Sequence, residues 1–367
     1  MRTQNKKGYL LCLLYFMFFA FIEICSSEIN PECSELKLKL KEDLTIKESE
    51  IDENYMFYRV SDIGVDSRRN IYIVDRGNCR VQVFNKNGKY LKTIGRRGKG
   101  PGEFEFPVSI FIDTEDNIYV KDGREIEKFN KNGDFVERIP CDYSTFDFSI
   151  PPYLGLRFVI TSEQRIFIPV LQFEESGAYN CLVMLDFKGK LIKEIDKLIE
   201  RNIKIKGKGG GGVFGGVLSP YALRLVLASF ENKIIYAKSD EYRLFVLDKE
   251  GNLIFEIKKD ENPIPVPRKA KKLKRMYIPE YCPFFTDILT DEKGRIWVIK
   301  FKSPSDKREE WDIDIFSSKG KFLYYTKLPC YPHVIKRGYI YSLLRSKETG
   351  NIMIKRLKIE NWNEIKY

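Results

Sequence analysis

Short runs of apolar residues, some alternating with polar ones, predict β-strands in the segment 61–94. The run around Ile73 is β-branched or aromatic, and the next two runs alternate polar with apolar side chains. Such runs favour pleated strands with one face against a core. The turns at 75–78 and 85–88 end in Asn or Gly, which tolerate the positive φ of a tight hairpin. The segment therefore predicts a four-stranded antiparallel meander, with strands at residues 61–66, 71–74, 80–84 and 90–94.

This unit recurs along the chain. A turn glycine before an apolar pair is found at Gly88, Gly133, Gly189, Gly251 and Gly320. A second-strand element of the type Asn-Ile-Tyr-Ile begins at Asn70, Asn117, Arg165, Lys233, Arg295 and Gly338. The spacing of roughly 45 to 70 residues lies in the range of propeller blades with insertions. The chain thus holds five full copies and a sixth that lacks its last strand.

One four-stranded sheet buries too little surface to be stable alone, whereas radial packing of several sheets leaves only short, protected edges. The predicted fold is therefore an all-β six-bladed β-propeller of four-stranded antiparallel blades. The sixth copy ends after residues 351–357, while the alternating run 35–41 belongs to no blade. We predict that this run, or residues 44–48 just after it, supplies the missing outer strand and closes the ring. The alternative is a free amphipathic segment.

The stretch NIYIVDRGNCRVQVFNKNGKYLKTIG, with its extension GRRGKGPGEF, resembles the NHL-repeat family of six-bladed β-propellers. It is especially similar to exported bacterial propellers that carry a GRxGxGPGEF-type extension after the first blade. The resemblance covers residues 36–358, strongly in the first two blades and weakly over 151–221. Members of the family mostly serve as binding scaffolds for protein, RNA or ligand, and some related six-bladed propellers are enzymes. The resemblance therefore implies the fold much more than an activity.

The first residues stand apart from the repeat. Arg2, Lys6 and Lys7 precede an almost purely apolar run, 8–22, which is short for a membrane span. We expect residues 1–27 to be a signal peptide. The repeat then predicts one closed domain over residues 28–367, although 367 residues could hold two or three ordinary domains.

Cys25 offers a second interpretation of this leader, as a lipid-attachment site. Lipoprotein signals favour a small residue where Ile24 stands, which argues against it, and Glu23 shortens any uncleaved anchor helix. On either interpretation the protein is expected to be exported, to the periplasm, the cell envelope or the extracellular space.

Six cysteines would remain after cleavage. They are Cys33, Cys79, Cys141, Cys181, Cys282 and Cys330. An exported protein can pair such residues, but the long spacings without a CxxC do not indicate zinc. Buried free thiols and one or two disulfides both stay open.

The formal net charge is +11, and part of the excess is clustered between residues 268 and 275. In a cytosolic protein such a cluster suggests nucleic acid. Because export is expected, we predict instead a protein partner or an anionic glycan or lipid surface in the cell envelope. A solvated loop rich in lysine is the alternative.

The order of strands in a blade decides which loops share a face. Connections from strand two to three, and from one blade to the next, emerge together on what we call the long-loop face. The four long connections fall there, at residues 95–107, 196–221, 258–283 and 303–310, and turns on the opposite, short-loop face stay short. Because function tends to lie on long loops held by a rigid scaffold, we predict a binding site here. Its predicted rim residues are Arg76, Arg96, Arg97, Lys99, Arg268, Lys272 and Arg275.

Candidate catalytic groups are few. The glycine-rich stretches 98–102 and 207–216 lack a Gly-Lys-Ser/Thr ending and a following helix, so neither predicts a phosphate loop. The single histidine, His333, cannot build a histidine-rich metal site; it is either a general base beside the channel or a structural residue. Carboxylates near the first strands could bind calcium or simply cap turns. These are Asp66, Asp113, Asp287 and Asp291.

Together these observations predict an exported, monomeric, non-enzymatic propeller that binds a partner through its long-loop face. No catalytic residue, metal ligand or cofactor is assigned, with calcium left open. The alternatives are a calcium-dependent hydrolase or lactonase of the six-bladed class, and a basic protein that binds membrane or glycan surfaces.

Overall fold

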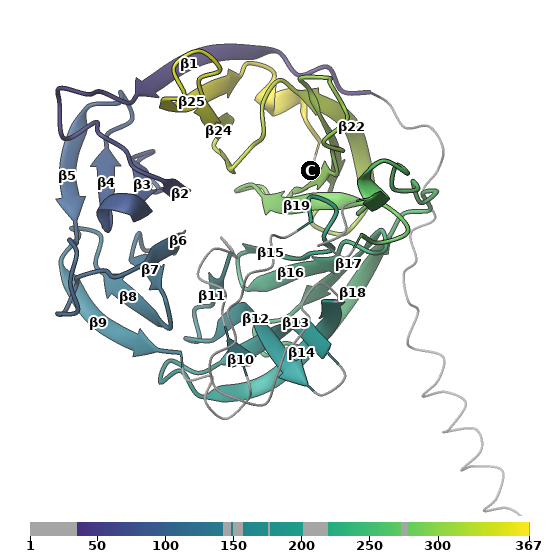
Figure 1. The fold of residues 1–367 in the computed structure, drawn as a ribbon, viewed down its shortest axis with the longest axis horizontal. Coiled ribbons are helices and arrows are strands. Elements are labelled where there is room, and N and C mark those ends of the chain that lie inside the picture. The colour runs from purple at the N-terminus through teal and green to yellow at the C-terminus, as the bar shows by residue number, and fades with distance from the viewer. Residues whose placement is uncertain are drawn as a thin grey trace, which may run out of the picture.

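The computed structural model describes residues 35–141, 148–149, 157–174, 177–200, 219–272 and 278–366. They form six antiparallel sheets arranged around a central axis (Figure 1), which confirms the predicted six-bladed β-propeller. Helix in these residues is limited to three short 3-10 turns, η1 (Arg76–Asn78), η2 (Ala270–Lys272) and η3 (Trp362–Glu364). No helix in this part of the chain has the length and apolar character needed to cross a membrane.

The first three blades follow one another along the chain. Blade I contains β2 (Val60–Val65), β3 (Ile71–Asp75), β4 (Arg80–Phe84) and β5 (Tyr90–Ile94). Blade II contains β6 (Pro107–Ile112), β7 (Ile118–Asp122), β8 (Glu125–Phe129) and β9 (Phe135–Pro140). Blade III contains β11 (Val159–Ile160), β12 (Ile166–Glu174), β13 (Gly177–Leu185) and β14 (Leu191–Glu200), and β10 (Phe148–Ser149) also pairs with β12.

The other three blades complete the circle. Blade IV contains β15 (Leu225–Phe230), β16 (Lys233–Lys238), β17 (Arg243–Leu247) and β18 (Leu253–Lys258). Blade V contains β19 (Phe285–Thr290), β20 (Ile296–Lys300), β21 (Trp311–Phe316) and β22 (Phe322–Leu328). Blade VI contains β23 (Val334–Lys336), β24 (Tyr339–Arg345), β25 (Ile352–Ile359) and, as its outer strand, β1 (Leu40–Lys47).

The N-terminal strand closes the ring, as the sequence predicts. Antiparallel pairing runs from Leu40 opposite Ile359 to Lys47 opposite Met353, so β1 spans parts of both candidate segments. An ion pair reinforces the closure: Arg356 Nε donates to Asp43 Oδ2 at 2.6 Å. The two ends of the chain therefore share one sheet (Figure 1).

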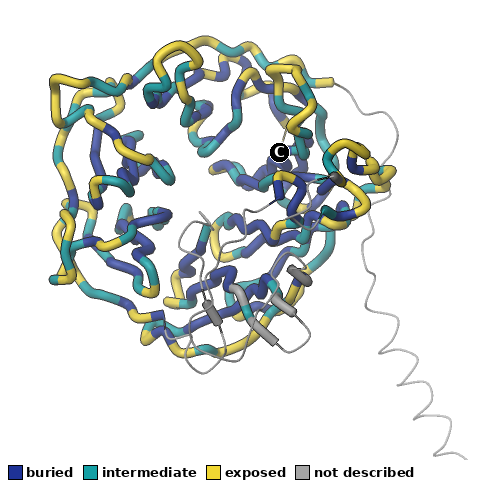
Figure 2. Tube along the Cα trace, in the orientation of Figure 1, coloured by how far each residue is buried: buried dark blue, intermediate teal, exposed yellow. Residues whose placement is uncertain are grey.

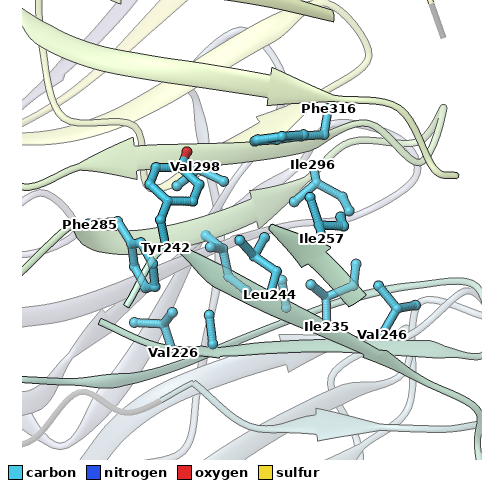
Figure 3. Close-up of a cluster of buried hydrophobic side chains, with 13 residues drawn as sticks. Val226, Ile235, Tyr242, Leu244, Val246, Ile257, Phe285, Ile296, Val298 and Phe316 are labelled. Atoms are coloured by element: carbon cyan, nitrogen blue, oxygen red, sulfur yellow. The ribbon is translucent and has the colours of Figure 1, made fainter. Parts of the chain in front are cut away.

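The hydrophobic core lies between neighbouring blades rather than inside any single one. Figure 2 shows buried residues on the inner strands and exposed ones around the outside. Figure 3 shows one such layer, in which Val226 and Leu244 of blade IV pack with Ile296 and Phe316 of blade V. Second strands have apolar side chains on both faces because each face meets a neighbouring blade; all five residues of β3 are buried. This packing makes the ring a rigid support for its loops.

Repeated side-chain caps hold the tight turns. Asp66 Oδ1 accepts the backbone N–H groups of Arg68 and Asn70 at 2.9 and 2.7 Å. Its Oδ2 accepts from the Asn70 side chain at 2.7 Å and from the Tyr72 hydroxyl at 3.3 Å. Asp113 and Asp291 cap the corresponding turns of blades II and V in the same way. The turn-capping interpretation of these three aspartates is therefore confirmed.

The five cysteines in the described residues are all buried. They are Cys79, Cys141, Cys181, Cys282 and Cys330, and Cys79, Cys282 and Cys330 are free thiols. Cys25, Cys33 and the whole leader 1–27 lie outside the described residues.

Candidate functional site

The connection from β5 to β6 is a folded platform on the long-loop face. Gly95 and Gly102 adopt φ of +71° and +73°, a region that favours glycine. They let the loop turn back over Phe104, which is fully buried and lies against Phe129 with ring centroids 5.8 Å apart. The Phe104 N–H donates to the Arg96 carbonyl at 2.8 Å. The glycine-rich stretch is thus an ordered surface that presents its charged side chains to solvent.

Four of the predicted rim residues lie together on and beside this platform. Arg76 stacks over the Phe106 ring, with Cζ 4.0 Å from the centroid. Arg97 Nη2 donates to the Gly77 carbonyl at 3.1 Å. Ion pairs at 2.8 and 3.3 Å join two exposed cations to carboxylates of the same loop, Arg96 to Glu103 and Lys99 to Glu105.

The other predicted rim residues belong to a different part of the ring. Arg268 is exposed in the connection from β18 to β19, and Lys272 lies in η2 of the same connection. Because this junction is three blades away from the junction of blades I and II, it lies on the opposite side of the ring (Figure 1). Arg275 lies outside the described residues. The structure therefore does not gather the predicted residues into one rim.

The described residues line two cavities along the central channel. The larger, of about 790 Å³, is lined by first strands of all six blades and reaches the short-loop turns at Glu115, Glu231 and Glu292. The smaller, of about 210 Å³, lies toward the long-loop end and is lined by residues of every blade except blade II. Both are lined by Asp62, Arg157, Leu227 and His333. These side chains therefore divide the channel.

A charged network forms this partition. Arg157 Nε lies 3.4 Å from Asp287 Oδ2, and Arg157 Nη2 donates to the His333 carbonyl at 2.7 Å. The Tyr331 hydroxyl donates to Asp287 Oδ2 at 2.9 Å. Asp62 accepts the backbone N–H groups of Ile63 and Ile110, at 2.9 and 3.0 Å. Each polar group of the partition is thus held by another part of the protein.

The three charged residues of the partition occupy equivalent positions in alternate blades. In each blade, one residue of the first strand pairs with the residue that begins the second strand. Asp62, Arg157 and Asp287 each lie three residues before that first-strand residue. Blade I therefore contributes an acidic residue, blade III a basic residue and blade V an acidic residue at the same level along the channel axis. Opposite charges so close in a region shielded from water attract each other strongly.

Burial and these charges set the protonation states. Burial raises the pKa of Asp62. Burial alone would lower the pKa of Arg157, but the carboxylates of Asp287 and Asp62 outweigh it and the pKa is raised. Burial and the nearby Arg157 charge lower the pKa of His333 to about 4. His333 Nδ1 accepts the Leu343 N–H at 3.1 Å, so the neutral ring carries its proton on Nε2. A histidine held in this way is a weak base, which supports its structural interpretation.

Calcium binding stays untested, and the described residues show where its candidate ligands lie. Among the described residues, no three His, Cys, Asp or Glu side chains group closely enough to hold a metal ion. Asp66, Asp113 and Asp291 use their oxygens on the turns, and Asp287 lies at the other end of its strand, in the partition.

Sequence reasoning missed Asp62, Arg157 and Tyr331 as channel residues. The available signal was a charged residue at one fixed position of otherwise apolar first strands. Recognising this signal required the correct strand register of blade III, where the sequence repeat is weakest.

Comparisons with known proteins agree with this architecture. A family model described as a 6-bladed beta-propeller, DUF5128, matches residues 50–207. No curated protein sequence matches the chain significantly. The match is to this model, so the resemblance to NHL repeats stays a prediction.

Solved structures extend the agreement to most of the chain. A DUF4221-family protein from Bacteroides vulgatus is 10% identical with a TM-score of 0.51, covering 89% of this chain and 99% of that one. A protein named as a candidate exported protein from Bacteroides fragilis is 13% identical with a TM-score of 0.54, covering 91% and 98%. A gluconolactonase from Xanthomonas campestris is 11% identical with a TM-score of 0.47, covering 90% and 98%. At such identities the likeness to the two Bacteroides proteins shows the fold alone, and the chain is a six-bladed β-propeller of four-stranded antiparallel blades.

Proposed function

We propose that this propeller is an exported, non-enzymatic binding module whose partner docks on the long-loop face. The proposal of export rests on the leader, in which Arg2, Lys6 and Lys7 precede the apolar run 8–22.

One observation carries the choice of face. The connection between blades I and II is folded over the buried Phe104 and presents Arg96 with 83% of its side chain exposed. A rigid surface of this kind loses little conformational entropy when a partner binds, and this lowers the cost of association.

The channel offers less support for catalysis. Arg157, Asp287 and Tyr331 satisfy one another, and His333 has a low pKa with Nδ1 already occupied. A general base needs a pKa near the working pH and a free acceptor atom. His333 and the Arg157–Asp287–Tyr331 contacts therefore give the hydrolase or lactonase alternative little support.

Masking one face at a time tests the proposal without assuming the chemistry of the partner. Exposed residues on the long-loop face, Glu53 and Lys307, and Lys131 on the short-loop face are each replaced by cysteine and coupled to a maleimide polyethylene glycol. The immobilised chain 28–367 is then incubated with the envelope fraction of its own cells. We expect the label at Glu53→Cys or Lys307→Cys to abolish capture and the label at Lys131→Cys to leave it intact.

Two results would contradict the proposal. The first is capture that survives both long-loop labels but not the short-loop label. The second is stoichiometric calcium in the purified protein together with hydrolysis of an aromatic ester or lactone, which would favour the enzyme.

A further inference from the structure

Three segments that are distant in the sequence meet on the long-loop face of blade I. They are the connection 48–59, the η1 turn and the platform 95–106. The Gly77 N–H donates to the Tyr58 carbonyl at 2.7 Å, and the Tyr58 N–H donates to Asp75 Oδ1 at 2.8 Å. A Cβ atom at position 77 would lie 2.1 Å from the Tyr58 oxygen, so only glycine permits this approach. Arg97 binds the Gly77 carbonyl from the third segment.

Three arginines converge at this junction, and together with Tyr58 we call them the three-arginine site. Arg59 Cζ lies 5.3 Å from the centre of the Tyr58 ring, while Arg76 and Arg97 have the contacts given above. None of the three guanidinium groups is within ion-pair distance of a carboxylate in the described residues. The charge of Arg59 also contributes, after burial, to lowering the pKa of Arg76, so the two groups repel each other.

Four carboxylates at the η1 turn, on the platform and on blade II are already engaged. Asp75 pairs with Arg80, Glu103 pairs with Arg96 and Glu105 pairs with Lys99. Asp122 accepts the backbone N–H groups of Glu105 and Phe106. The uncompensated positive charge of the site is therefore available to an incoming anion.

Apolar side chains border the same site. Tyr58 is 55% exposed and Met56 is 37% exposed. Arginine, tyrosine and methionine are the residues enriched in the centres of protein–protein interfaces. Arg59 also holds a φ of +61°, an uncommon backbone conformation for a residue other than glycine. Such conformations persist where the surrounding structure enforces them, often at functional sites.

We propose that the three-arginine site binds an acidic polypeptide segment, in which clustered carboxylates flank an aromatic or apolar side chain. The inference deepens the proposed function and rests on it. A guanidinium fork can accept a carboxylate through two parallel hydrogen bonds, and an adjacent aromatic side chain can pack on Tyr58. Exposed Asp52 and Glu53 belong to the connection 48–59, and exposed Glu105 belongs to the platform. An extended anionic bilayer would meet these carboxylates, whereas a narrow acidic segment reaches the arginines between them.

The test compares two variants of the chain 28–367 that lose the same charge. One carries Arg59→Gln, Arg76→Gln and Arg97→Gln. The control carries Lys86→Gln, Lys131→Gln and Lys188→Gln, three exposed lysines on the turns of the short-loop face. The probe is a fluorescent random copolymer of glutamate and tyrosine, and binding is followed by anisotropy.

We expect the arginine variant to bind the copolymer about tenfold more weakly than the parent, because each exposed ion pair contributes a factor of about two to five. The control should stay within about twofold, and parent binding should fall with added salt. Tyr58→Ala should weaken binding of the copolymer but not of poly-glutamate. The single variant Arg59→Gln, at an exposed position, serves if the triple variant unfolds at a lower temperature than the parent.

Four outcomes would overturn the inference. They are no binding of the copolymer by the parent, equal losses in the two triple variants, tighter binding of phosphatidylglycerol vesicles than of copolymer, and tighter binding of polygalacturonate. The capture assay with the envelope fraction distinguishes failure of the inferred acidic-segment site from failure of the proposed function. If the Glu53→Cys label abolishes capture while the arginine variant captures normally, the face is right and the site is wrong. If capture survives the arginine variant and both long-loop labels but not the short-loop label, both proposals fail.

Discussion

Replacing Ile46 with alanine tests how strongly the N-terminal strand holds the ring closed. Ile46 is 3% exposed and belongs to a buried cluster with Ile63, Tyr341 and Ile354. The substitution removes three buried carbon atoms at about 0.8 kcal/mol each. With the cavity left behind, we expect the free energy of unfolding to fall by about 3 kcal/mol, within the range of roughly 2 to 5 kcal/mol for such changes.

Urea unfolding followed by tryptophan fluorescence measures this loss. The matched control is Lys47→Ala, the next residue of β1, which is exposed and should change stability by about 0.5 kcal/mol or less. A loss below about 1 kcal/mol for Ile46→Ala, or equal losses in the two variants, would refute the close packing of β1 on the sixth blade.

Three further predictions concern the channel and the platform. As pH falls from 6.5 toward about 4, the unfolded chain binds a proton at His333 before the folded protein does, so the free energy of unfolding falls. The slope of stability against pH should be smaller in His333→Gln; equal slopes would contradict the low pKa. Arg157→Met leaves Asp287 without its cation and should cost about 3 kcal/mol. Adding Asp287→Asn should restore part of that loss in urea unfolding, and additive losses would contradict the coupling. Phe104→Ala should cost about 3 kcal/mol and weaken copolymer binding, and unchanged binding would show that the platform does not position Arg97.

The fold was predictable because its signals are local. Asp66 caps a turn four residues long, and Gly88 supplies positive φ at a hairpin, so each unit can be recognised within a short window. Ring closure was predictable by counting strands, since five complete blades and one incomplete blade left only the run 35–41 and residues 44–48 just after it to supply the missing strand.

The channel and the three-arginine site depend on contacts between distant segments. Arg157 meets Asp287 only if the register of blade III is correct, and that blade is the least regular in sequence. The position of Arg59 depends on the contact between Gly77 and Tyr58. No periodicity in the sequence indicates this contact. Arg268 was grouped with Arg96 because both lie on long loops; the position of each loop around the circle separates them.

Pairing of β1 with β25 also sets the order in which the molecule can mature. Leu40 finds its partner Ile359 only after nearly the whole chain has been synthesised. Until then β1 is an unpaired strand, and the five complete blades form an open arc. The two free strand edges of this arc can pair with other chains. A contact of such long sequence separation is also slow to form, because loop closure costs entropy before the contact stabilises anything. The last step of folding should therefore be the slowest, and chains stopped short of Ile352 should aggregate rather than accumulate as a stable, smaller ring.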